Sequence, residues 1–162
     1  LEYLIGRENT RKTLKRFFNE FKFRHPTPND IKRTAERISG AELDWYLTDW
    51  TKTTNTIDYA IKSFENNAIS LERIGRMPMP IDILVEYTDG SKESFYIPLK
   101  MMYFQKENPS PTIKRTVLKD WSWAEQTYTL QLPNQSTVKK ITIDPSGFMA
   151  DIKLQNNTLE VK

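Results

Sequence analysis

Residues 1–50 place apolar side chains at the spacing of an α-helix. A short opening helix is expected to end at Gly6, because glycine tolerates the left-handed conformation of a helix C-terminus. A second helix is expected from about Asn9 to about Arg24. Its apolar residues fall at i, i+3, i+4 and i+7 and so share one face: Leu14, Phe17, Phe18 and Phe21. We expect that face to be buried.

The segment FKFRHPTPND predicts the end of one helix and the start of the next. Pro26 disfavours a helical conformation at His25, so the second helix should finish before that residue. Thr27 can cap a third helix that has Pro28 in its first position. Asp30 would lie in the first turn, where a negative charge suits the positive end of the helix dipole.

Two more features complete the helical part of the chain. The third helix presents Ile31, Ala35 and Ile38 on one side and should stop at Gly40. A short fourth helix follows, again with apolar residues at i, i+3, i+4 and i+7: Leu43, Tyr46, Leu47 and Trp50. The polar residues 51–56 then separate the helical pattern from a different one.

After Thr56 apolar and polar residues alternate, as they do in half-buried strands. The clearest example is Ile81–Tyr87, whose odd-numbered positions are apolar, and Asp89-Gly90 after it is a strong hairpin signal. Similar runs predict strands at residues 57–64, 69–74, 95–99, 113–118, 128–132, 138–143, 152–154 and 159–161.

The change of period predicts an α+β chain in two parts. Residues 1–55 should form about four helices. Residues 56–162 should form an immunoglobulin-like antiparallel β-sandwich, because many short strands follow one another without an intervening helix.

Composition narrows the classes of function. The chain has 24 Lys and Arg against 21 Asp and Glu, a net charge of +3, and residues 1–50 hold ten basic and eight acidic side chains. Neither half resembles a nucleic-acid-binding tail. There is no cysteine, so disulfides and thiolate metal sites are excluded. No apolar run reaches the length of a membrane span. The chain begins in mid-pattern at Leu1, which suggests an excised segment whose targeting information, if any, lies upstream.

No catalytic, cofactor-binding or metal-binding residue is expected in this chain. His25 is the only histidine, whereas a catalytic zinc site needs three protein ligands. We favour His25 as a polar residue of an interhelix loop over a contact to a site on another segment. No serine lies in a G-x-S-x-G motif. Asp44 and Asp49 are five residues apart and diverge on a helix, so they do not signal an acid/base pair.

Two surface features have two interpretations each. A basic cluster lies opposite the phenylalanine stripe of the second helix: Arg11, Lys12, Lys15 and Arg16. It could bind nucleic acid, but a solvated helix face is the better interpretation. Trp121 and Trp123 would share one face of an extended segment and could bind a sugar or a peptide. We favour the alternative that they close the edge of the sandwich.

Four segments carry a resemblance to a known family. SGAELDWYLTDWTKTTNTIDYAIKSFE, residues 39–65, resembles the C-terminal edge of the catalytic domain in aminopeptidase N-like zinc metallopeptidases, the gluzincins. Residues 1–30 are similar to the helices before that edge, and Trp45 and Trp50 occupy its tryptophan helix. MPIDILVEYTDGSKESFYIPL and ITIDPSGFMADIKLQNN resemble the small immunoglobulin-like sandwich of bacterial members. The resemblance thus covers nearly the whole chain.

The catalytic elements of that family do not occur in these 162 residues. The His-Glu-x-x-His motif, the third-ligand glutamate, the transition-state tyrosine and the Gly-x-Met-Glu-Asn loop are all missing. The resemblance therefore implies a non-catalytic C-terminal portion that braces the catalytic domain of the same polypeptide and walls its substrate cleft. The parent enzyme would hold zinc and cleave N-terminal residues from peptides. The alternative is a free-standing β-sandwich module that binds glycan or protein through Trp121 and Trp123.

The phenylalanines of the second helix predict an uncovered surface. Phe17, Phe18, Phe21 and Phe23 crowd this segment, whereas the third helix offers only small or aliphatic residues to cover them. Even two exposed aromatic rings approach the few hundred Å² that usually mark an interface. We expect the isolated chain to self-associate through its helical half, or to leave those helices mobile.

Overall fold

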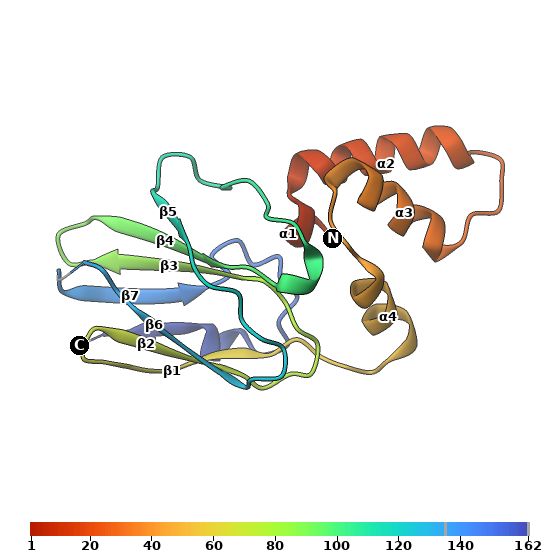
Figure 1. Cartoon of the computed structure of the whole chain (residues 1–162). Coiled ribbons are helices and arrows are strands. Elements are labelled where there is room, and N and C mark those ends of the chain that lie inside the picture. Colours follow the sequence, from red (N-terminus) through yellow and green to blue (C-terminus); the bar gives the residue numbers. More distant parts are fainter. Residues whose placement is uncertain (135, 162) are drawn as a thin grey trace. The chain divides into compact units, whose positions relative to one another are not determined.

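Figure 1 shows the computed structural model of the chain, which describes residues 1–134 and 136–161. The chain divides into two compact units. The helical unit contains residues 1–55 together with 100–109, and the β unit contains residues 56–99 together with 110–162. Residues 100–109 therefore leave the β unit and belong with the helices.

Among the described residues, the helical unit contains four α-helices and one short 3₁₀-helix. These are α1 (Glu2–Ile5), α2 (Arg7–Phe21), α3 (Pro28–Ser39), α4 (Asp44–Lys52) and η1 (Lys100–Met102). Figure 1 shows α2 and α3 side by side, joined by the loop that follows Phe21. The predicted helices are all present.

The start of α3 is as the sequence predicted. The backbone N–H and the hydroxyl of Thr27 both donate to Asp30 Oδ2, at 2.7 and 2.8 Å. Pro28 occupies the first helical position, where its missing N–H costs nothing. Gly40 ends the helix in the left-handed conformation, with φ at 78°. Local capping chemistry therefore fixes both ends of α3.

The end of α2 comes earlier than predicted. The helix stops at Phe21, and the N–H of Lys22 donates to the carbonyl of Phe18 at 2.9 Å. Phe23 then adopts a left-handed φ of 63°. The chain has thus turned away before Pro26, so the proline is not what ends the helix.

The predicted burial of the α2 phenylalanine face is wrong. Thr13 is the one buried residue of α2, whereas Leu14 is 52% and Phe18 is 66% exposed. Phe17 and Phe21 are partly covered and contact each other, with ring centroids 5.1 Å apart. The buried side of α2 is therefore the one that contains Thr13, and Phe17 and Phe21 are partly covered.

Eight strands form two sheets in the described part of the β unit. They are β1 (Tyr59–Glu65), β2 (Ala68–Arg73), β3 (Ile81–Tyr87), β4 (Lys92–Ile97), β5 (Arg115–Val117), β6 (Thr127–Gln131), β7 (Val138–Ile143) and β8 (Thr158–Glu160). One sheet has the order β1-β2-β6 and the other β5-β4-β3-β7-β8. All neighbours are antiparallel except β4 and β5, which pair in parallel. The chain therefore has an α+β layout of helices followed by two sheets rich in antiparallel pairs.

The predicted strand at residues 152–154 is wrong. This stretch leads into a 3₁₀-helix, η2 (Leu154–Asn157). Asp151 Oδ1 accepts the N–H of Lys153 at 2.8 Å, and this local bond turns the chain. Ile152 and Leu154 are both exposed, so their alternation does not reflect a buried strand face.

The core of the β unit is closely packed around β3. Its four odd-numbered residues are fully buried, and Ile69 and Leu71 of the other sheet are fully buried as well. Asp82, on the opposite side of β3, is buried as well. The strand is therefore covered on both faces at its start, more than the half-buried pattern predicted.

Candidate functional site

Trp121 and Trp123 do not share an exposed face, so the alternative of a paired binding platform is wrong. Trp121 is only 5% exposed, and its ring packs between Tyr59 and Tyr128 with centroid distances of 5.5 and 5.4 Å. Its indole N–H donates to the carbonyl of Glu125 at 3.0 Å. Trp123, by contrast, is 62% exposed. The two side chains point into different environments because residues 118–126 are a loop with a turn at its centre, in which side chains need not alternate.

Arg73 lies beside Trp123, at the end of β2. Its Nη2 donates to the carbonyl of Trp123, while Nε and Nη1 are buried without a hydrogen-bond partner. These residues border a small cavity of about 10 Å³, the space of roughly one water. Its lining residues are Tyr59, Arg73, Pro78, Met79, Leu99, Trp121, Ser122 and Trp123. A cavity of this size fits a single buried water better than a sugar or a peptide side chain.

The aromatic residues Tyr59 and Trp121 near this cavity are almost fully buried, and burial affects the acidity of Tyr59. It raises the pKa of Tyr59 to about 12, so the phenol stays protonated at neutral pH. The hydroxyl accepts the N–H of Met79 at 2.8 Å. Tyr59 thus acts as a packing residue with one satisfied polar end, and not as an acid or a base.

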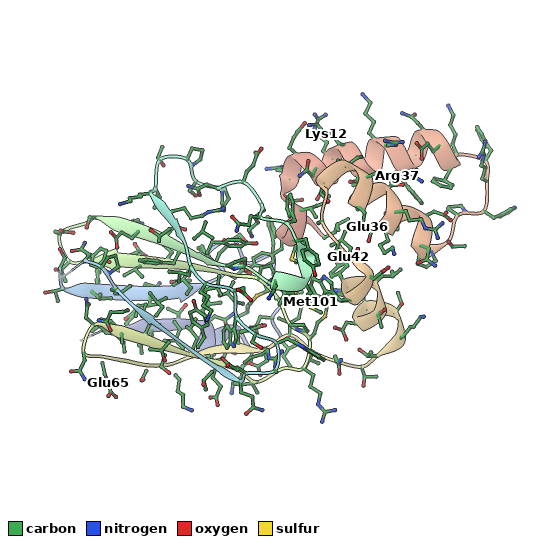
Figure 2. All side chains as sticks on the ribbon, viewed as in Figure 1. Lys12, Glu36, Arg37, Glu42, Glu65 and Met101 are labelled. Atoms are coloured by element: carbon green, nitrogen blue, oxygen red, sulfur yellow. The ribbon has the colours of Figure 1, made fainter. Side chains whose placement is uncertain are left out.

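One group of carboxylates in the described residues has the spacing of a cation site. Glu36, Glu42 and Asp44 bring oxygens within 4.8 Å of one another, and Figure 2 labels Glu36 on α3 and Glu42 just before α4. The ammonium of Lys32 already lies against them, 3.7 Å from Glu36 and in direct contact with Asp44. Its hydrogen bond holds the pKa of Asp44 below the usual range.

Two oxygens of this group also accept hydrogen bonds from the backbone. Glu36 Oε1 accepts the N–H of Leu43, and Glu42 Oε1 accepts the N–H of Asp44, each at 3.0 Å. A lysine that neutralises the carboxylates, together with these bonds, makes the group a connection between α3 and α4. We interpret it as a structural ion pair.

His25 is exposed in the loop between α2 and α3. This placement agrees with its interpretation as a polar loop residue. Within the described residues, His25 belongs to no group of three or more His, Cys, Asp or Glu side chains that could hold a metal ion.

Three exposed apolar side chains of the helical unit are a further functional candidate, and we call them the apolar patch. It consists of Leu14, Phe18 and Phe23, which are 52%, 66% and 102% exposed. Leu14 and Phe18 are four residues apart on α2 and so are neighbours on its surface. An exposed phenylalanine next to an exposed leucine is typical of a surface that a partner covers. The exposure of Phe18 and Phe23 agrees with the uncovered surface predicted from the sequence, whereas Phe17 and Phe21 are partly covered.

Helix geometry places the four residues of the predicted basic cluster on two sides of α2. At about 100° per residue, Lys12 and Arg16 lie on the side of α2 away from the patch. Arg11 and Lys15 instead precede Leu14 and Phe18 by three positions and lie next to them. The prediction that the whole cluster lies opposite the aromatic residues is therefore wrong for half of its members.

Ion pairs occupy part of the basic cluster. Arg11 and Lys12 both reach Glu8, at 2.8 and 3.6 Å, and Arg16 pairs with Glu20 at 2.7 Å. Hydrogen bonding to Arg11 lowers the pKa of Glu8. These exposed pairs fit the prediction of a solvated helix face.

Searches for similar proteins add no assignment. No model of a known protein family matches the sequence, and no curated protein matches it either. Among the described residues, no helix combines the length and the apolar character needed to cross a bilayer. The functional evidence therefore comes from the residues of this chain, and mainly from the apolar patch.

Proposed function

We propose that this chain is the non-catalytic C-terminal portion of an aminopeptidase N-like zinc metallopeptidase. In this proposal the helical unit walls the substrate cleft of the parent enzyme, and the β unit braces the catalytic domain. The two sheets would correspond to the immunoglobulin-like sandwich of that family. Zinc and the peptide substrate would be held by other parts of the same polypeptide.

The observation that supports the proposal is the apolar patch of Leu14, Phe18 and Phe23. A helical unit that functions alone would be expected to bury such residues, because each exposed phenylalanine forgoes roughly 1.5 to 3 kcal/mol of burial free energy. Docking against another domain would recover part of that free energy. The order of elements agrees with the resemblance, since helices precede a region of two sheets.

The experiment compares the chain with the longer polypeptide encoded in the same reading frame. We expect a His-Glu-x-x-His motif upstream of Leu1. The longer polypeptide should contain one zinc per chain and hydrolyse a fluorogenic aminoacyl substrate, whereas the 162-residue chain should do neither. Replacing the glutamate of that motif with glutamine is the control, because it should abolish turnover and leave both folded units intact. A reading frame without the motif, or stoichiometric zinc in the chain alone, would contradict the proposal.

A binding module that acts through Trp123 is the second candidate function. The exposed indole favours it, because a flat aromatic face can stack on a sugar or contact a peptide. Because Trp121 is buried, it cannot contribute to such a binding surface together with Trp123. Titration with oligosaccharides and acidic peptides, read by the fluorescence of wild type and Trp123→Ala, would test it.

A further inference from the structure

Positive charge is concentrated around the apolar patch. Residues 7–25 contain seven Lys and Arg and two Glu, a net charge of +5, whereas the whole chain has +3. The other residues together therefore carry −2. The balance of ten basic and eight acidic residues over 1–50 conceals this concentration, because the other positions of that range hold six acidic and three basic side chains.

Three basic residues border the patch directly. Arg11 precedes Leu14 by three positions, Lys15 precedes Phe18 by three, and Lys22 follows Phe18 by four. Residues three or four apart are neighbours on a helix surface. The exposed side of α2 thus has an apolar centre with basic side chains along its edge.

Two of these edge residues are available for a partner. Lys15 and Lys22 are exposed and make no ion pair with another described residue, whereas Arg11 is already engaged by Glu8. Arg24, just beyond the helix, is exposed and also lacks an ion pair within the described part of the chain. A partner that covers Phe18 will bring its own groups close to these cations.

We propose that the patch docks into an apolar groove bordered by carboxylates on the upstream catalytic domain of the same polypeptide. This inference rests on the proposed function and adds the chemistry of the partner surface. A groove with a neutral rim would strip water from Lys15 and Lys22 without replacing it, which is costly for a charged group. Carboxylates at the rim would offset that cost and select the correct partner.

The charge also argues against a second copy of this chain as the occupant. Two copies that meet through the same patch bring two segments of net +5 together. Like charges placed opposite each other at an interface cost several kcal/mol. Self-association through this face should therefore be weak at low salt and should strengthen when salt screens the repulsion.

The test measures binding of the 162-residue chain to the separately expressed upstream polypeptide, by titration calorimetry in about 50 mM and about 500 mM NaCl. Lys15→Glu/Lys22→Glu reverses the rim, and Phe18→Ser removes the centre of the patch. Lys114→Glu/Lys119→Glu is the matched control, since both lysines are exposed in the β unit and the change in net charge is the same. Circular dichroism confirms that each variant keeps its helix content.

We expect the wild type and the control to bind alike. The reversed rim should raise Kd about tenfold or more at low salt, and the higher salt concentration should remove most of that difference. Phe18→Ser should weaken binding at both salt concentrations. Binding that depends on Phe18 but not on the lysines or on salt would overturn the carboxylate rim and leave the proposed function standing.

Two further outcomes would overturn this inference. No binding by any variant at either salt concentration would overturn the proposed function and this inference together. Tighter binding to phosphatidylserine vesicles or to duplex DNA than to the upstream polypeptide would also overturn it, because either result would assign the basic edge of α2 to an anionic lipid surface or to nucleic acid.

Discussion

Phe95 on β4 and Phe18 on α2 are the same side chain in opposite environments. Phe95 is 1% exposed in the β unit, whereas Phe18 is 66% exposed in the helical unit. Their neighbours follow the same division, since β3 is almost entirely buried and α2 buries only Thr13. The β unit covers Phe95, whereas the helical unit leaves Phe18 uncovered. An element that obeys local folding rules can still lack the partner that its apolar side chains require.

The largest difference is expected between the two phenylalanines themselves. Phe95→Ala should lower the free energy of unfolding by about 3 to 5 kcal/mol, because it leaves a cavity in a packed core. Phe18→Ala should change it by less than about 0.5 kcal/mol, since an exposed ring loses few contacts. Urea denaturation followed by tryptophan fluorescence measures both. Equal losses in the two variants would contradict the division between the units.

Gly75 offers a second way to test the packing of the β unit. An added Cβ at this position would lie 2.2 Å from Thr56 O and 2.6 Å from Asp58 N, which are backbone atoms that cannot easily move. Gly75→Ala should therefore lower the free energy of unfolding by about 2 to 3 kcal/mol. Gly90→Ala is the control, because its site is open and only its positive φ of 87° opposes the change. We expect the control to cost about 1 kcal/mol, and a ranking in the other order would argue against the close contact at Gly75.

A smaller effect is expected from a buried polar contact. Asp151 Oδ2 accepts the N–H of Tyr59 at 2.9 Å, and Oδ1 accepts the N–H of Lys153 at 2.8 Å. Asp151→Ala leaves the first of these donors buried without a partner and should cost about 1 to 3 kcal/mol. Asp151→Asn keeps one acceptor and should cost less. Thermal unfolding of the two variants measures the difference, and an equal cost would show that the contact with Tyr59 is unimportant.

The smallest effect concerns the helical unit and depends on pH. The backbone N–H and then the hydroxyl of Thr27 lower the pKa of Asp30 below its usual value of 3.8. The stabilisation is present above pH 3.8 and is lost as pH falls through the lowered pKa of the folded state. Far-UV circular dichroism should show α3 fraying in that acidic range. Asp30→Asn should remove this step, and an unchanged acid profile in that variant would reject the role of the carboxylate.

The sequence predicted features that depend on local chemistry. Thr27, Pro28 and Gly40 fix the ends of α3 by capping and by backbone preference, and the structure confirms each of them. The alternation in Ile81–Tyr87 likewise identifies β3, because strand burial has a period of two. The order of helices followed by strands also came from local patterns.

Features that depend on distant partners were predicted less well. The stripe on α2 predicted an apolar face correctly but could not show that Thr13, and not Phe18, lies on the buried side. The spacing of Trp121 and Trp123 assumed an extended segment, whereas a loop separates their environments. Arg73 was missed altogether, because no sequence signal distinguishes it from an ordinary strand-end arginine. Orientation and packing arise from residues far apart in the chain.

The most direct test of the account is hydroxyl-radical footprinting of Phe18 and Phe23. Their oxidation is compared between the 162-residue chain and the full-length polypeptide from the same reading frame, with exposed Trp123 as the internal reference. If the apolar patch docks onto an upstream catalytic domain, oxidation of both phenylalanines falls several-fold in the full-length polypeptide while that of Trp123 does not. Equal oxidation of Phe18 and Phe23 in the two proteins would contradict the account.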